Sequence, residues 1–320
     1  MSPLPEMSAI REAQQLLRQY FPPTPLVRAT CLNGLGANVY LKLETALPTG
    51  SFKPRGALYA LIKNLERGRI DEVVTSSTGN HGAATAFAAR TLGVPATIFL
   101  PDPPNPVKRK KIEDLGARIF CHGSNDLAAA SQKATEYARR PGVYLLSDAT
   151  APELPAGPAT IGVELLEQCR DLSAVLVPMG DTALIRGIGA AVKLLSPQTR
   201  VIGVQAERAP SYVLSWRAGK AVSTETCDTI ADGLATRTPD AANVEDIRKV
   251  VDEVMLVSEA QMIGAIRHLH SQENVLAEPA GAAATAAYLA SPISGQVVLL
   301  VSGGNISEEL CRQAGIARSA

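Results

Sequence analysis

The fold of this sequence is decided by one stretch, Pro48-Thr49-Gly50-Ser51-Phe52-Lys53-Pro54-Arg55-Gly56-Ala57. It follows an alternating apolar run, 39–43, which predicts a strand, and it opens the run 58–65, which predicts a helix. Pro54 suits the first turn of that helix, where its missing N–H would have no partner anyway. Lys53 is therefore expected at a strand-to-helix junction, beside the bulk of Phe52.

This position makes Lys53 a candidate for covalent catalysis. Apolar neighbours and a helix N-terminus disfavour the charged form of a lysine, which leaves an amine that can condense with a carbonyl. The alternative is an ordinary solvated Lys-Pro-Arg turn, which is the commoner structure for ten such residues. Motifs further along the chain decide between the two.

Composition excludes several classes of protein. The chain has 320 residues, 46% of them hydrophobic, which predicts two domains or one divided domain. Lys+Arg and Asp+Glu are both 31, so no net field favours nucleic acid or an anionic membrane, and 4% aromatic residues argue against base stacking.

Targeting signals and cysteine usage indicate the compartment of the protein. No run approaches the roughly eighteen apolar residues of a membrane span, and residues 1–10 lack a signal pattern, so we expect a cytoplasmic location and no membrane partner. The cysteines are odd in number and far apart, which predicts reduced thiols instead of a zinc site or disulfide framework. They are Cys31, Cys121, Cys169, Cys227 and Cys311.

Strand and helix signals alternate along almost the whole chain. The predicted strands are 39–43, 73–75, 96–100, 117–121, 143–147, 174–178, 201–206, 254–257 and 296–302. The predicted helices are 8–20, 58–65, 83–91, 106–115, 124–139, 159–169, 184–196, one from 259, and 280–290. This alternation predicts an α/β fold with parallel-type sheets covered by helices. The segment 148–158 is expected to cross between two units, so we predict a large domain from 1–69 and 148–320 and a small domain from 70–147.

Three further junctions follow predicted strands, at the carboxyl ends where open α/β sheets bind ligands. Ser76-Ser77-Thr78-Gly79-Asn80-His81-Gly82 could receive a carboxylate on backbone amides, or be an ordinary helix N-cap. Val177-Pro178-Met179-Gly180-Asp181-Thr182-Ala183-Leu184 could hold a phosphate through amides and the helix dipole. In Leu300-Val301-Ser302-Gly303-Gly304-Asn305, Ser302 could offer a neutral hydroxyl to a heterocyclic nitrogen, or merely start a turn.

Taken together, these motifs resemble one enzyme family. Ser51-x-Lys53-x-Arg55-Gly56-Ala57 and the Ser-Thr-Gly-Asn-His-Gly loop are followed by Ala231-Asp232-Gly233, Glu278-Pro279-x-Gly281-Ala282 and Ser302-Gly303-Gly304-Asn305. Their order and spacing resemble the threonine/serine dehydratase branch of the fold-type II pyridoxal-phosphate enzymes, which also includes serine racemases and hydroxyaspartate dehydratases. The resemblance covers about residues 20–310. It implies a two-domain, tryptophan synthase β-like fold, with pyridoxal 5'-phosphate in the interdomain cleft, and we expect a homodimer.

The resemblance also implies roles for individual residues. Lys53 would carry the cofactor as a Schiff base, with Phe52 packed beside it. Asn80 would bind the ring hydroxyl, and Ser302 the pyridine nitrogen. The Ser77–His81 loop would receive the substrate carboxylate, with Thr78 where racemases present an acid/base serine. The implied phosphate and remaining cofactor contacts are Gly180, Asp181, Thr182, Ala183, Leu184, Gly233 and Glu278.

These roles predict a reaction. The cofactor is an electron sink, and a neutral serine at its ring nitrogen weakens that sink, which suits prompt loss of a β-hydroxyl. Lys53, once released by the substrate, is the natural base for the α-proton. The resemblance therefore implies dehydration and deamination of L-threonine or L-serine to a 2-oxo acid and ammonia.

Some positions depart from the family pattern. The phosphate loop is a glycine run in many members, whereas here Asp181 would repel a phosphate unless its side chain points away, and we expect it to do so. Thr78 keeps a hydroxyl but adds a methyl that stiffens χ1, so racemisation is not favoured. Val213 stands where an acidic ligand would help a cation, so we expect no metal.

Rival functions fit less well. A nicotinamide-dependent dehydrogenase needs glycines in the turn itself, but position 182 is threonine. A β-replacement synthase of the same fold is disfavoured by His81 and by Ala231-Asp232-Gly233, and Lys53 with Ser302 argues against a catalytically silent protein. Serine racemase and hydroxyaspartate dehydratase stay open as alternatives.

Overall fold

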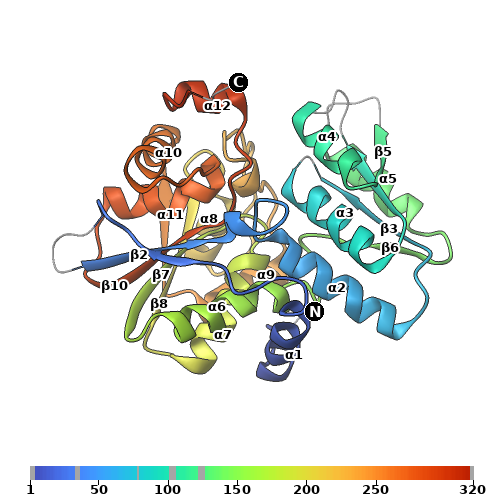
Figure 1. Cartoon of the computed structure of the whole chain (residues 1–320), viewed down its shortest axis with the longest axis horizontal. Helices are drawn as coiled ribbons and strands as arrows, with labels where there is room; N and C mark the ends of the chain where they lie inside the picture. The colour runs from blue at the N-terminus through green and yellow to red at the C-terminus, as the bar shows by residue number, and fades with distance from the viewer. Residues whose placement is uncertain (1–3, 33–36, 78, 101–105, 122–126, 318–320) are drawn as a thin grey trace.

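Two separate sheets organise the molecule, which is described here from a computed structural model. It covers residues 4–32, 37–77, 79–100, 106–121 and 127–317. Ten strands and their covering helices form a six-stranded and a four-stranded sheet in this part of the chain (Figure 1). The predicted α/β fold with parallel-rich sheets is confirmed.

The six-stranded sheet has the order β1-β2-β10-β7-β8-β9. Its strands are β1 (Leu26–Arg28), β2 (Ala37–Leu43), β7 (Leu172–Pro178), β8 (Arg200–Ala206), β9 (Glu253–Val257) and β10 (Gly295–Val301). Only the β1–β2 pair is antiparallel among the strand pairs that the structure describes. The register between β10 and β2 places Val301 opposite Leu43, so the two strands end side by side although the sequence separates them widely.

The four-stranded sheet is parallel throughout its described pairs, in the order β5-β4-β3-β6. Its strands are β3 (Glu72–Ser76), β4 (Ala96–Leu100), β5 (Arg118–Cys121) and β6 (Val143–Leu145). Every residue of β4 is buried, as a continuous apolar run in a covered parallel sheet should be.

Helices cover both sheets, and α2 joins the two units. The α-helices are α1 (Met7–Leu17), α2 (Lys53–Arg67), α3 (Asn80–Leu92), α4 (Pro106–Asp114), α5 (Leu127–Tyr137), α6 (Ala156–Gln168), α7 (Ala183–Leu195), α8 (Ser211–Ala218), α9 (Ala241–Val250), α10 (Glu259–Glu273), α11 (Pro279–Ala290) and α12 (Glu308–Gln313). Two short 3₁₀ turns lie at Glu44–Ala46 and Asp232–Leu234. In Figure 1, α2 runs from the six-stranded unit towards the four-stranded one, and it packs against both α3 and α6. None of the described helices combines the length and apolar character that a membrane span requires.

The structure differs from the sequence-based elements in several places. It adds β1, α8, α9 and α12, which are short or carry charged residues and so lack a long apolar period. Helix α6 begins at Ala156, inside the segment expected to be a crossing. The predicted start of a helix at 124 lies outside the described residues. The predicted domain boundaries stay a prediction; all strands of the four-stranded sheet fall within 70–147.

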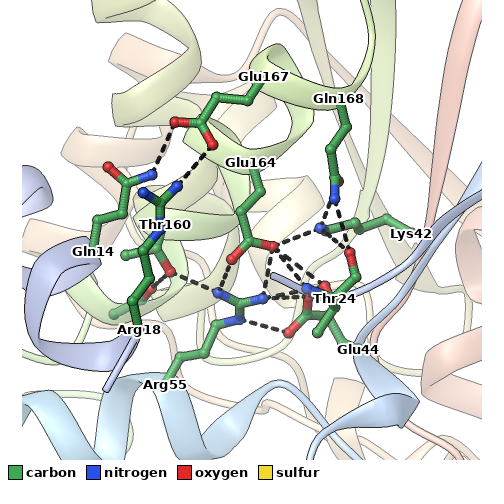
Figure 2. Close-up of polar contacts among 11 residues, drawn as sticks. Gln14, Arg18, Thr24, Lys42, Glu44, Arg55, Thr160, Glu164, Glu167 and Gln168 are labelled. Atoms are coloured by element: carbon green, nitrogen blue, oxygen red, sulfur yellow. Dashed lines mark hydrogen bonds and ion pairs between the residues drawn. The ribbon is translucent and has the colours of Figure 1, made fainter. Parts of the chain in front are cut away.

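A buried network of charges fixes the first turn of α2 (Figure 2). The Arg55 guanidinium is 1% exposed and donates to both carboxylate oxygens of Glu44, at 2.8 and 3.0 Å, and to both of Glu164, at 2.6 and 2.9 Å. Lys42 Nζ donates to Glu164 at 2.6 Å and to the Thr24 carbonyl at 2.8 Å. Two cations thus face two carboxylates in a part of the molecule that is almost fully buried.

The network joins segments that are distant in sequence. Lys42 comes from β2, Arg55 from α2 and Glu164 from α6. Burial lowers the pKa of Lys42 despite its carboxylate neighbours. Burial alone would raise the pKa of Glu164, but Arg55 and Lys42 outweigh it and hold that pKa below its ordinary value. Arg55 is therefore the central partner of this network, two residues after Lys53.

We expect Arg55→Met to lower the free energy of unfolding by about 3–5 kcal/mol, because it leaves Glu44 and Glu164 buried with a single cation. Arg18→Met is the matched control, since Arg18 pairs with Glu167 at 2.9 Å with both side chains about half exposed. That pair should contribute less than about 1 kcal/mol. Urea denaturation followed by circular dichroism measures both variants, and equal losses would contradict the importance of the buried network.

Candidate active site

A short backbone pairing brings the Lys53 junction to the end of β10. Phe52 N–H donates to the Ser302 carbonyl at 3.0 Å, and Gly304 N–H donates to the Gly50 carbonyl at 2.9 Å. Ser51 and Gly303 form an antiparallel bridge between these two bonds. Ser302 therefore lies beside the start of α2 because β2 and β10 are neighbours in the sheet.

One cavity collects almost all the residues that the sequence singled out. They lie at the carboxyl ends of strands in both sheets, as the rule for open α/β sheets predicts. The lining includes Phe52, Lys53, Ser77, Asn80, His81, Gly180, Asp181, Thr182, Ala183, Leu184, Gly233, Glu278 and Ser302. Thr78 lies outside the described residues. Other residues of this lining were not assigned to the site from the sequence, chiefly Asp148, Asp232 and Thr236.

Lys53 lines this cavity and contacts a residue that the sequence did not predict. Its Nζ lies 4.9 Å from the centroid of the Phe52 ring and forms an ion pair with Asp148. Lys53 therefore contacts a carboxylate in addition to the apolar neighbour and the helix N-terminus that the sequence predicted. Asp148 follows the end of β6, so the strand-end rule was the signal that could have found it.

Asp148 also faces a histidine. Its Oδ1 lies 3.4 Å from Nδ1 of His81, whose Nε2 lies 2.9 Å from the Leu146 carbonyl oxygen. Burial alone would raise the pKa of Asp148, but the charges of Lys53 and His81 outweigh burial and hold the pKa below its ordinary value. Asp148 is thus a carboxylate that stays charged between two nitrogen bases.

Hydrogen bonds to two residues of the six-stranded unit orient the Asn80 amide. Asn80 Nδ2 donates to Glu278 Oε1 at 2.6 Å, and Asn305 Nδ2 donates to Asn80 Oδ1 at 2.7 Å. Lys111 Nζ donates to Asn305 Oδ1 at 2.7 Å and to the Thr49 carbonyl at 2.6 Å. These contacts tie α3 and α4 to the six-stranded unit next to the cavity.

The loop before α7 forms the opposite wall. A Cβ on Gly180 would lie 2.0 Å from the Gly233 carbonyl oxygen, so only glycine fits there. Thr182 has φ of 69°, a left-handed conformation that is strained for a β-branched residue. The loop ends at the N-terminus of a thirteen-residue helix, whose free amides and dipole favour an anion.

Asp181 does not point away from the cavity, so that expectation was wrong. Its half-buried side chain accepts a hydrogen bond from Thr236 Oγ1 at 2.9 Å, and the residue lines the cavity. Burial, and then the negative charge of Asp148, raise the pKa of Asp181. Thr236, distant in sequence, holds the carboxylate inward, which no local pattern could reveal.

Comparison with known proteins assigns the family. The description "Pyridoxal-phosphate dependent enzyme" matches residues 17–303. The chain belongs to the family of pyridoxal-phosphate dependent enzymes. Pyridoxal phosphate is the cofactor of this family, as the resemblance implied.

Relatives within the family agree over most of the chain. An L-threonine ammonia-lyase of Thermotoga maritima is 38% identical over 300 residues, 93% of this chain and 75% of the relative. A catabolic L-threonine dehydratase of Staphylococcus aureus strain N315 is 33% identical over 96% of this chain and 90% of the relative. Among solved structures, maize serine racemase superposes with a TM-score of 0.91 at 27% identity, covering 98% of this chain and 97% of that one. A threonine deaminase of T.th. has a TM-score of 0.88 at 33% identity, covering 95% of this chain and 99% of that one.

The residues of the cavity fit the family's cofactor. A lysine amine, an oriented amide and a serine hydroxyl can hold its ring, and a helix N-terminus behind a Cβ-free Gly180 can hold its phosphate. The Asp181 carboxylate fits this cofactor poorly, because its negative charge would repel the negatively charged phosphate. Within the described part of the chain, no group of three or more His, Cys, Asp or Glu side chains is arranged to hold a metal ion.

We expect Asp181→Asn to leave cofactor affinity unchanged or to tighten it up to about tenfold. The variant removes a negative charge beside the phosphate loop but keeps an oxygen that accepts from Thr236. Titration of the apo-protein with cofactor, followed by absorbance, measures the dissociation constant. Asp228→Asn, at an exposed aspartate, is the matched control. A tenfold weakening in Asp181→Asn would show that its charge organises the loop.

The same variant has a pH signature. In the wild type, folding raises the pKa of the Asp181 carboxyl above its ordinary value in the unfolded chain. Asp181 therefore contributes stability below the ordinary aspartate pKa, and this contribution is lost as the pH rises through the raised pKa. Asp181→Asn should remove that fall in stability with rising pH.

Proposed function

We propose that this chain is a lyase that eliminates the β-hydroxyl of a small β-hydroxy amino acid, L-threonine or L-serine, and releases a 2-oxo acid and ammonia. The observation that carries the proposal is the single cavity that holds Lys53 beside Ser302, Asn80 and the N-terminus of α7. The names of relatives at 33–38% identity, threonine ammonia-lyase and threonine dehydratase, support this choice of reaction.

Five features of the chain hold the cofactor in this proposal. Lys53 Nζ attaches it covalently, and the Phe52 ring packs against it. Ser302 forms a neutral hydrogen bond to its ring nitrogen, while Asn80 binds its ring hydroxyl through the amide that Glu278 and Asn305 orient. The amides from Gly180 to Leu184 hold its phosphate. When bound, the cofactor supplies an electron sink for the α-carbon of an amino acid.

The remaining residues of the cavity bind and deprotonate the substrate. Backbone amides at the N-terminus of α3, with Ser77, receive the substrate carboxylate. Lys53 Nζ, freed when the substrate binds, removes the α-proton.

A panel of β-hydroxy amino acids tests the function directly. Purified holoenzyme incubated with L-threonine, L-serine or hydroxyaspartate should release 2-oxo acid from L-threonine or L-serine fastest. Lys53→Ala should lose about 10³-fold or more of this rate. Lys133→Ala, at a half-exposed lysine of α5, should keep the wild-type rate. No 2-oxo acid from any of the three substrates would refute the proposal.

Chiral analysis in the same tubes tests the alternative, which the superposition with maize serine racemase favours. Formation of D-serine faster than pyruvate would replace the lyase by a racemase. Because Lys53 reaches one face of the substrate, racemisation needs a second acid on the other face, for which Thr78 is the residue to substitute. The homodimeric state and the cytoplasmic location stay predictions.

A further inference from the structure

Three titratable side chains of the cavity wall form a continuous chain of contacts. Asp148 Oδ2 contacts Lys53 Nζ, and Asp148 Oδ1 lies 3.4 Å from His81 Nδ1. Arg186 and Asp181 are the other charged groups that act on Asp148, and they approach from α7 and the loop before it. Asp148 is therefore the middle member between an amine and an imidazole.

The hydrogen bonds of His81 fix where its proton lies. Nε2 is 2.9 Å from the Leu146 carbonyl oxygen, which also accepts from Thr75 Oγ1 at 2.8 Å. A carbonyl oxygen only accepts, so Nε2 carries a hydrogen. In a neutral imidazole, Nδ1 would then be a bare acceptor.

That bare acceptor would face another acceptor. His81 Nδ1 and Asp148 Oδ1 are both buried, and neither has another hydrogen-bond partner in the part of the chain that the structure describes. Two unpaired acceptors at 3.4 Å repel each other, and burial makes the repulsion costly. The contact is favourable only when a proton is bound between these two atoms.

We propose that Asp148 is a positioning residue for Lys53, and that His81 shares a proton with Asp148 Oδ1 and so keeps Oδ2 directed at Lys53 Nζ. This inference rests on the proposed function, because it assigns Lys53 as the base that removes the α-proton. The charge of Asp148 faces the atom on which positive charge develops during that step.

The elimination then balances without consuming either residue. The substrate Cα–H bond breaks, and its proton goes to Lys53 Nζ, where the Asp148 carboxylate stabilises the new ammonium. The electron pair of that bond forms a carbon–carbon double bond as the Cβ–O bond breaks. The proton on Nζ joins the departing hydroxyl as water, and Asp148 and His81 return to their starting state.

Two substitutions of Asp148 distinguish a role of its charge at Lys53 from a purely structural role. Asparagine keeps the shape of Asp148 but loses its charge, whereas glutamate keeps the charge but changes the length. If charge at Lys53 matters, Asp148→Asn should lower kcat for 2-oxo acid release about 10²-fold or more with little change in KM. Asp148→Glu should then recover part of that loss. The opposite ranking, with Asn near wild type and Glu worse, would overturn the proposal.

Nitrogen NMR of histidine-labelled protein reads the shared proton without any turnover. The chain has only 4 histidines, so a His81→Gln variant assigns the signal of His81. At the assay pH, Nδ1 of wild-type His81 should show a bound or shared proton, and in Asp148→Asn it should become a bare acceptor. Asp228→Asn, at an exposed aspartate that pairs with Arg208, is the control and should leave the His81 signal unchanged.

These readouts separate the two proposals. A bare Nδ1 in the wild type would overturn the shared proton, whatever the activity. If the wild type releases no 2-oxo acid, the proposed function fails and the role of Asp148 in proton removal fails with it. A shared proton that Asp148→Asn abolishes would then still support the His81–Asp148 pair on its own.

Discussion

Burial of the Arg55 guanidinium is the constraint on which the site depends. A charge removed from water needs partners in a fixed geometry, and Arg55 finds four carboxylate oxygens within 2.6–3.0 Å. Since these carboxylates come from the end of β2 and from α6, α2 begins in one place and one orientation. Figure 2 shows these contacts of Arg55, and Lys53 precedes Arg55 by about half a turn in the same first turn of α2.

Parallel topology explains why distant segments meet at Lys53. The carboxyl ends of β2, β10 and β7 lie along one edge of the six-stranded sheet, and each continues into a junction of the cavity. The four-stranded sheet contributes the ends of β3 and β6, which supply His81 and Asp148. The cavity is thus built from two sheets, while Lys111 and Asn305 tie the two units beside it.

The sequence predicted the parts of this site that depend on local patterns. A strand, a glycine- or proline-punctuated turn and a helix recur around Lys53, Asn80, Gly180 and Ser302, and the strand-end rule then placed the four junctions together. It could not predict the direction of Asp181, because that depends on Thr236, which lies 55 positions away in sequence. It also missed Asp148, because the segment after β6 was interpreted only as a crossing between units.

The central claim is that the junction before α2 holds the cofactor through Lys53. Borohydride reduction of the holoenzyme, followed by proteolysis and mass spectrometry, tests it most directly, since reduction makes the attachment permanent. The account predicts the cofactor's mass on the peptide that contains Lys53 and on no other. A label on a different lysine, with the Lys53 peptide unmodified, would contradict the account.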